Sequence, residues 1–186
     1  MYGYIKGVVT KVTPKHIIIE NNGIGYLLIV SNPYNFKLNE EYKIFTHQYV
    51  REDLIDLYGF SKEEEKELFL KLISVSGIGP KTALSILASS SVNNVIKAIE
   101  DRNARYLKKF PGIGAKASQQ IILDLQGKIS FDDLNEAVPS SKLQDVEDAL
   151  VALGYSKKDL SKILSKLDSS KEEGELVKDA LKLLVK

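Results

Sequence analysis

The chain has 186 residues, of which 44% are apolar, and it contains two histidines and no cysteine. This length allows one to three small domains, and the apolar share is sufficient for a folded core. Without cysteine, the chain cannot form disulfides, a thiolate nucleophile or a cysteine zinc site. Two histidines are too few to favour a multi-histidine metal site. We expect no metal and no cofactor. The amino-terminal MYGYIKGVV lacks a signal-peptide pattern and no apolar run could cross a bilayer, which favours a soluble cytoplasmic protein without membrane contact.

The formal net charge of +1 conceals an uneven distribution along the chain. Residues 1–60 hold six basic and six acidic side chains, whereas residues 68–129 hold nine basic and three acidic ones. Residues 130–186 are slightly acidic, with nine basic and twelve acidic side chains. The basic middle favours a polyanionic ligand such as nucleic acid, although a solvated helical surface has the same composition.

Residues 1–60 have the pattern of short β-strands. Four runs rich in β-branched and aromatic residues, YIKGVV, HIIIE, GYLLIV and YKIFTHQYV, are separated by TPK, NNG and SNP. Asn22 and Gly23 lie between two of these runs and predict a tight hairpin. Four or five short strands predict a small barrel such as an OB-fold, and periodicity alone leaves a small β-sandwich open.

Residues 61–129 change to a helical period. Ser61 and Glu64 have the spacing of a capping box at the start of a first helix, which we expect to stop at Gly77. The next helices are expected to begin at Pro80, near Val92, at Ala104 (through Phe110) and after Gly114. The apolar positions expected to face the core are Leu68, Leu72, Ile73, Val75, Ala83, Leu84, Ile86, Leu87, Ile121, Ile122 and Leu125.

The carboxy-terminal part predicts a linker and a small bundle. Residues 131–141, FDDLNEAVPSS, lack a periodic pattern and predict a flexible linker. Three amphipathic segments follow, LQDVEDALVALGY, SKKDLSKILSKL and KEEGELVKDALKLLVK, and Gly154 occupies the position of a helix C-terminus. They predict a three-helix bundle at residues 142–186.

The sequence Gly-Ile-Gly-x-Lys occurs twice in the basic middle, in SVSGIGPKTA (residues 74–83) and in FPGIGAKAS (residues 110–118). Neither copy is a P-loop, because a P-loop needs an adjacent Gly-Lys-Ser/Thr and Pro80 separates glycine from lysine in the first copy. Neither copy supplies the third glycine of a dinucleotide-binding fingerprint. We therefore expect no nucleotide hydrolysis by this chain alone and assign no catalytic residue.

Two helices joined by a Gly-x-Gly turn can bind an anion. Glycine permits positive φ and leaves room for a ligand, and the amides at the start of the following helix point outward. A lysine in the first helical turn can reach the same anion, and two such sites in tandem suit a nucleic-acid backbone without contacts to base edges. A glycine that merely ends a helix explains a single copy equally well, and the repetition favours phosphate binding. The residues assigned to this role are Gly77, Ile78, Gly79, Lys81, Gly112, Ile113, Gly114 and Lys116.

The repeated motif resembles the helix-hairpin-helix DNA-binding motif, and its surroundings resemble one family over the whole chain. FTHQYVREDLIDLYGF (45–60), LISVSGIGPKTALSIL (72–87) and LKKFPGIGAKASQQIILDL (107–125), with NGIGYLLIV and ALVALGY, resemble the RuvA family of bacterial Holliday-junction branch-migration subunits. The hairpins alone are shared by many repair proteins. The order of barrel, VRED segment, double hairpin, linker and helical tail is far more specific.

The resemblance implies a protein of DNA recombination and repair that holds a four-way junction open and square. It implies an OB-fold at residues 1–62 that builds a homotetramer and forms the junction face, and a tandem helix-hairpin-helix domain at 63–130 that holds the duplex arms. Beyond the linker, a domain at 142–186 would dock on the hexameric RuvB ATPase, so that the motor is a partner. The sequence leaves open whether two tetramers pair face to face, and the RuvC resolvase is a further candidate partner.

The resemblance also assigns a role to Glu52 and Asp53, which occupy the family's acidic-pin position near the junction centre. Four copies of two carboxylates would repel the phosphates and help to part the strands. Without the resemblance, the same pair would be interpreted as an ordinary acidic turn between strands.

The second hairpin departs from the family pattern. Ala115 stands where relatives often have another basic residue, and Gln119-Gln120 stands where a charged pair is common. Its phosphate contacts are therefore expected to depend on backbone amides and Lys116, with Lys108 and Lys109 nearby.

Other interpretations stay open at this point. Leu153 and Tyr155 are candidates for the motor-docking surface, but either could belong to the core of a bundle that only increases solubility. A protein that binds duplex DNA nonspecifically would use the same hairpins. An accessory module of a nuclease would need metal-binding carboxylates, for which Glu52, Asp53 and Asp56 are available.

Overall fold

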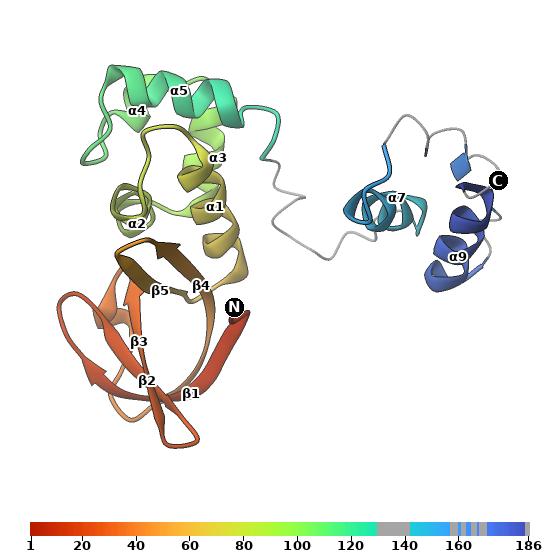
Figure 1. The fold of residues 1–186 in the computed structure, drawn as a ribbon. Coiled ribbons are helices and arrows are strands. Elements are labelled where there is room, and N and C mark those ends of the chain that lie inside the picture. The colour runs from red at the N-terminus through yellow and green to blue at the C-terminus, as the bar shows by residue number, and fades with distance from the viewer. Residues whose placement is uncertain (130–141, 157–159, 161–162, 165–166, 168–170, 185–186) are drawn as a thin grey trace. The chain divides into compact units, whose positions relative to one another are not determined.

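The computed structural model describes residues 1–129, 142–156, 160, 163–164, 167 and 171–184, and its contacts divide the chain into two compact units, Met1–Asn135 and Glu136–Lys186 (Figure 1). The linker predicted at 131–141 and most of the middle tail helix, SKKDLSKILSKL, lie outside the described residues. None of the helices in the described part of the chain is long and apolar enough to span a membrane.

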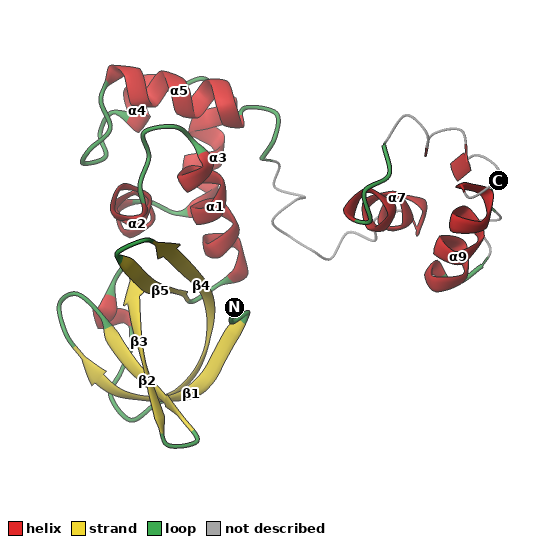
Figure 2. Ribbon diagram, viewed as in Figure 1, coloured by secondary structure: helices red, strands yellow, loops and turns green. Residues whose placement is uncertain are grey.

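The first unit begins with a closed five-stranded barrel, as predicted (Figure 2). Its strands are β1 (Tyr4–Val12), β2 (Ile17–Asn21), β3 (Ile24–Val30), β4 (Glu41–Arg51) and β5 (Leu54–Phe60), with the 3-10 turn η1 (Pro33–Asn35) before β4. The strand order is β1-β2-β3-β5-β4, and β3 pairs with β5 in parallel while β1 pairs with β4 antiparallel. Because these two pairings close the sheet on itself, the barrel is confirmed and the sandwich is excluded.

Local signals in the barrel sequence act as expected. The hairpin at Asn22-Gly23 is confirmed, since both residues have positive φ, 49° and 81°. Gly7 is required by packing, because a Cβ atom there would overlap the carbonyl oxygen of Glu20 on β2. The barrel interior is filled by Ile5, Val9, Ile17, Ile19, Leu28, Val30, Phe36 and Ile44.

The change to a helical period is also confirmed. The described part of the first unit continues with α1 (Glu63–Ser74), α2 (Pro80–Ser89), α3 (Val92–Glu100), α4 (Ala104–Leu107) and α5 (Ala115–Leu125). Pro80 is the first residue of α2, where its missing N–H costs no hydrogen bond. α4 ends before the predicted Phe110, because residues 108–114 form the second turn.

The capping box predicted at Ser61 and Glu64 is wrong. Lys62 is the N-cap of α1 and its side chain makes no capping hydrogen bond. The helix begins one residue later than expected, so the carboxylate that reaches back belongs to Glu65 and accepts the Ser61 backbone N–H at 3.0 Å. β5 continues to Phe60 and thereby sets where α1 can begin.

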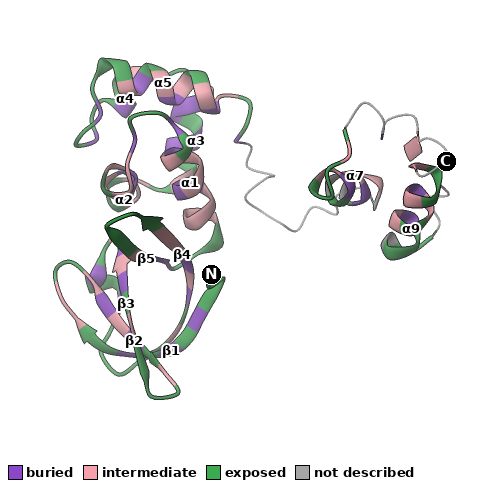
Figure 3. Ribbon diagram, viewed as in Figure 1, coloured by how far each residue is buried: buried purple, intermediate pink, exposed green. Residues whose placement is uncertain are grey.

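The helices of the first unit share an apolar core with the end of β5, separate from the core inside the barrel, and Figure 3 marks the buried residues along the strands and helices. Phe69 of α1 packs against Tyr58 and Phe60 of β5, with ring centroids 5.1 Å and 4.9 Å apart. Of the predicted core positions, Ile73, Leu87 and Ile122 are half-buried, and Leu68, Leu72, Val75, Ala83, Leu84, Ile86, Ile121 and Leu125 are buried. The helical turns are therefore held at a defined place relative to the β4–β5 hairpin.

The second unit contains α7 (Lys142–Ala152) and α9 (Glu173–Leu184) among its described residues. Gly154 follows α7 with a φ of 97°, which confirms the predicted helix C-terminus. The two helices and Leu160, which lies between them in the chain, share a small core, whose buried residues are Val146, Leu150, Leu160, Leu176 and Ala180.

Candidate nucleic-acid interface

The two Gly-Ile-Gly turns have the same backbone conformation. Gly77 and Gly112 have φ values of 85° and 83°, in the region that favours glycine. The Ile78 N–H donates to the carbonyl of Val75 at 3.1 Å, and the Ile113 N–H donates to that of Phe110 at the same distance. The sequence repeat is therefore a repeat of structure.

Ile78 and Ile113 fix the turns between their helices, as the sequence predicts. Their exposed fractions are 5% and 6%, and both side chains belong to the core shared with the barrel. A buried isoleucine between two glycines leaves only the backbone of each turn at the surface.

Gly79 and Gly114 are the N-caps of α2 and α5, and the chain itself does not require glycine at either position. Their φ values of −97° and −90° are accessible to any residue. A Cβ atom at either position would meet no atom of the described residues within 4 Å. Because the first amides of each helix have no acceptor within the helix, a glycine here leaves space for a ligand to reach them.

The four predicted lysines all lie at or beside the turns. Lys81 and Lys116 are exposed and occupy the second position of α2 and α5, whose first turns contain no acidic residue. They add to the positive end of each helix dipole. Lys108 and Lys109 are exposed just before the second turn, and the Lys109 ammonium lies 5.5 Å from the ring centroid of Tyr106.

Thr82 brings the two turns together. A Cβ atom at Gly112 would lie 3.3 Å from the Thr82 hydroxyl oxygen, so the second turn lies against the first turn of α2. Thr82 is not among the site residues predicted from the sequence, although it directly follows Lys81. The second turn and the start of α2 are therefore neighbours in the fold.

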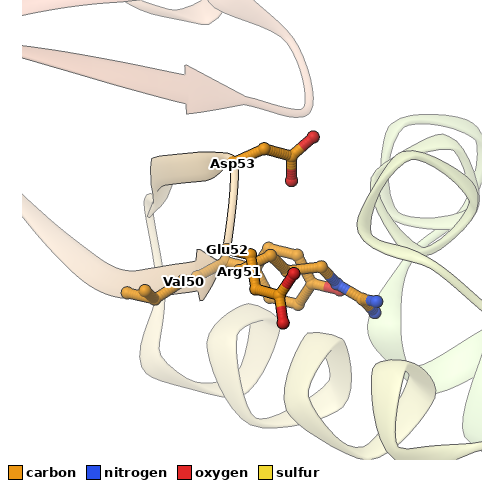
Figure 4. Close-up of a pocket in the computed structure, with 5 residues that line it drawn as sticks. Val50, Arg51, Glu52 and Asp53 are labelled. Carbon is orange, nitrogen blue, oxygen red and sulfur yellow. The ribbon is translucent and has the colours of Figure 1, made fainter.

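Glu52 and Asp53 form the two-residue connection between β4 and β5, where Arg51 pairs with Leu54 (Figure 4). We call this pair the acidic turn. Both side chains are exposed, and neither takes part in an ion pair within the described residues. Two unpaired carboxylates at the tip of a hairpin produce a concentrated negative charge there.

The base of this hairpin is anchored by aromatic side chains. Burial and the Asp56 carboxylate raise the pKa of Tyr58 to about 12, so its hydroxyl stays protonated and donates to Asp56 at 3.2 Å. The ring centroids of His47 on β4 and Phe69 on α1 are 6.0 Å apart. Burial, with Lys66 nearby, lowers the pKa of His47.

The structure separates the two candidate docking residues of the tail. Leu153 is 63% exposed, whereas Tyr155 is half-buried and packs against the core of the second unit. The Tyr155 N–H donates to the carbonyl of Leu150 at 3.1 Å, which ties the residue to the end of α7. Leu153 is thus the one of the pair that a partner could reach directly.

The carboxylates considered for a nuclease do not converge. Among the described residues, no three or more histidine, aspartate and glutamate side chains are placed together to hold a metal ion. Asp56 is engaged by the Tyr58 hydroxyl, away from the acidic turn at the hairpin tip.

Comparison with known proteins agrees with this order of parts. Three family models match the chain: "RuvA N terminal domain" at residues 1–59, "SAM-like Helix-hairpin-helix tandem" at 69–128, and "RuvA, C-terminal domain" at 141–185. A protein of Acholeplasma laidlawii named "Holliday junction branch migration complex subunit RuvA" is 52% identical over the full length of both chains. Proteins of the same name from two Streptococcus pneumoniae strains, Hungary19A-6 and TIGR4, are 47% identical, again over all of both chains.

Proposed function

The chain belongs to the RuvA family, and from this premise we propose that it binds four-way (Holliday) DNA junctions and presents them to the RuvB ATPase for branch migration. The resemblance seen in the sequence is confirmed by matches to all three of its parts. The chain acts as a non-catalytic subunit of recombination and DNA repair, and ATP hydrolysis belongs to the partner motor. A cytoplasmic location fits this role.

The duplicated turn is the observation that carries this proposal. Each copy presents outward amides, a lysine in the first helical turn and a glycine that neither the backbone nor the packing requires. Such a site binds one phosphate, and two such sites bind a DNA backbone. Because the contacts are to phosphates, binding is independent of base sequence and weakens steeply with salt.

The division of labour follows the architecture. We assign oligomerisation and the junction face to residues 1–62, duplex binding to 63–130, a linking role to 131–141 and motor docking to 142–186. The separate second unit supports this assignment, because residues 136–186 hold nine basic and ten acidic side chains and so carry no excess of positive charge to attract DNA. Leu153 and Tyr155 are the proposed docking residues.

We further propose a homotetramer in which four copies surround the junction, with pairing of two tetramers as an alternative assembly and RuvC as a further partner. In this arrangement the acidic turns of four copies lie near the crossover. Their unpaired carboxylates repel phosphates there, which keeps the strands apart and able to move.

A competition gel shift between a four-way junction and linear duplex of equal length, with the oligomeric mass measured alongside, tests the proposal. We expect strong junction preference by a tetramer or an octamer. A double variant with Lys81→Glu and Lys116→Glu should lose binding, while Lys178→Glu on α9 makes the charge change of one of these substitutions outside the site and should retain binding. Equal binding of both DNA forms by a monomer would favour the alternative, a nonspecific duplex binder.

A further inference from the structure

The charges at the tip of the β4–β5 hairpin are held apart. Arg51 directly precedes the acidic turn, yet no Arg51 nitrogen lies within 4.0 Å of a carboxylate oxygen of Glu52 or Asp53 in this fully described hairpin. The guanidinium is instead bound by Tyr49. Its Nε donates to the Tyr49 hydroxyl at 2.5 Å, and its central carbon lies 5.2 Å from the ring centroid. Figure 4 shows the Arg51 guanidinium pointing away from the Asp53 carboxylate.

Tyr49 is itself fixed by the anchored base of the hairpin. Alternation along β4 places Tyr49 and Arg51 on the same face of the strand. The Tyr49 ring is half-buried and meets the Tyr58 ring edge-on, with 6.3 Å between centroids. Tyr58 in turn packs against Phe69 of α1, so a chain of aromatic contacts joins Arg51 to the helix that precedes the first Gly-Ile-Gly turn.

We propose that Tyr49 is a positioning residue, which holds the Arg51 guanidinium away from the acidic turn so that both carboxylates face the DNA unneutralised. The inference rests on the proposed role of the acidic turn at the junction. The carboxylates of Glu52 and Asp53 directly follow Arg51 in the chain, and an ion pair of a released Arg51 with either would cancel one of the two negative charges in each copy. The strength of the repulsion thus depends on a tyrosine that does not itself need to touch DNA.

Arginine side-chain NMR tests the positioning without DNA. The chain has only three arginines, so the Arg51 Nε–H signal can be assigned as the one that disappears in Arg51→Lys. In the wild-type protein we expect slow exchange of this proton with water and cross-peaks to the Tyr49 ring. Tyr49→Phe keeps the ring and its contact with Tyr58 but removes the acceptor, so exchange should accelerate and cross-peaks to Glu52 or Asp53 should appear. Unchanged exchange in Tyr49→Phe would overturn the proposal.

A double-mutant cycle then connects the position of Arg51 to function. Tyr49→Phe should tighten junction binding about two- to fivefold at low salt, the range expected for one exposed ion pair. It should have no effect in a Glu52→Gln/Asp53→Asn background, nor in Arg51→Gln. An equal change in the neutralised background would mean that Tyr49 acts through the fold, which overturns the proposal. Release of Arg51 in the spectra with unchanged junction affinity would support the positioning and contradict the proposed role of the acidic turn.

Discussion

Replacing single glycines of the first turn by alanine should separate DNA binding from folding. Gly77 has a φ of 85°, where a Cβ atom costs about 1–2 kcal/mol, so Gly77→Ala should lower the free energy of unfolding by that amount. Gly79 has a φ of −97° and open space around its Cα atom. Alanine there gains about 0.4–1 kcal/mol through the unfolded chain and loses a similar amount as a poorer N-cap. The stability of Gly79→Ala should therefore lie within about 0.5 kcal/mol of wild type.

The same substitution should nevertheless impair junction binding. A methyl group at position 79 stands between a phosphate and the outward amides of α2. Since a hydrogen bond to a charged group contributes about 1.5–3 kcal/mol, losing one weakens binding at least about tenfold. Gly114→Ala should behave in the same way at the second turn.

Urea denaturation and junction gel shifts on the same preparations provide the two readouts. Gly174→Ala, at an open position of α9, is the matched control and should leave junction affinity unchanged. Wild-type affinity in Gly79→Ala would show that no phosphate approaches this glycine. A destabilisation as large as that of Gly77→Ala would show that the fold, and not a ligand, requires it.

Four further outcomes are expected. Lys81→Glu and Lys116→Glu should each weaken the binding of all DNA sequences alike and reduce the steepness of log affinity against log salt by about 1. Filter binding at several salt concentrations measures both effects, and an altered sequence preference would contradict phosphate binding. Neutralising the acidic turn should tighten junction binding in gel shifts, and weaker binding would refute the repulsion. Deleting residues 142–186 should spare DNA binding and abolish stimulation of the RuvB ATPase; lost DNA binding would refute the division of labour. Because the pKa of His47 is lowered in the folded protein, its contribution to stability is present above about pH 6.5 and is lost as the pH falls through the native pKa. His47→Gln should therefore weaken the pH dependence of the free energy of unfolding between about pH 5 and 8. An unchanged pH profile in this variant would exclude His47 as its source.

The sequence determined the features that depend on a few neighbouring residues. Asn22-Gly23 selects a tight hairpin, Pro80 starts a helix, and Gly77 and Gly112 allow the positive φ of the two turns, because each of these residues restricts or extends the accessible φ values of its own position. The first helix was expected to stop at Gly77 but ends at Ser74. The repeat of Gly-Ile-Gly-x-Lys identified both candidate phosphate sites for the same reason, since a local turn and the helix after it build the whole site.

Helix boundaries were less accessible from the sequence. Ser61 and Glu64 match a capping box, but the end of β5 at Phe60 and the packing of Phe69 on Tyr58 set the start of α1 one residue later. The spacing of Ser and Glu in the sequence does not distinguish between two helix starts one residue apart, whereas the packing of α1 on the barrel does.

Features that depend on residues far apart in the chain could not be predicted from local patterns. Closure of the barrel follows from the parallel pairing of β3 with β5, and the proximity of the two turns follows from Thr82 meeting Gly112. The separation of Arg51 from the acidic turn likewise requires Tyr49, which Tyr58 and Phe69 hold in place across three elements. Local sequence patterns determine backbone conformation at each turn and helix end. The distance between two side chains on different elements is instead determined by the core in which those elements pack together.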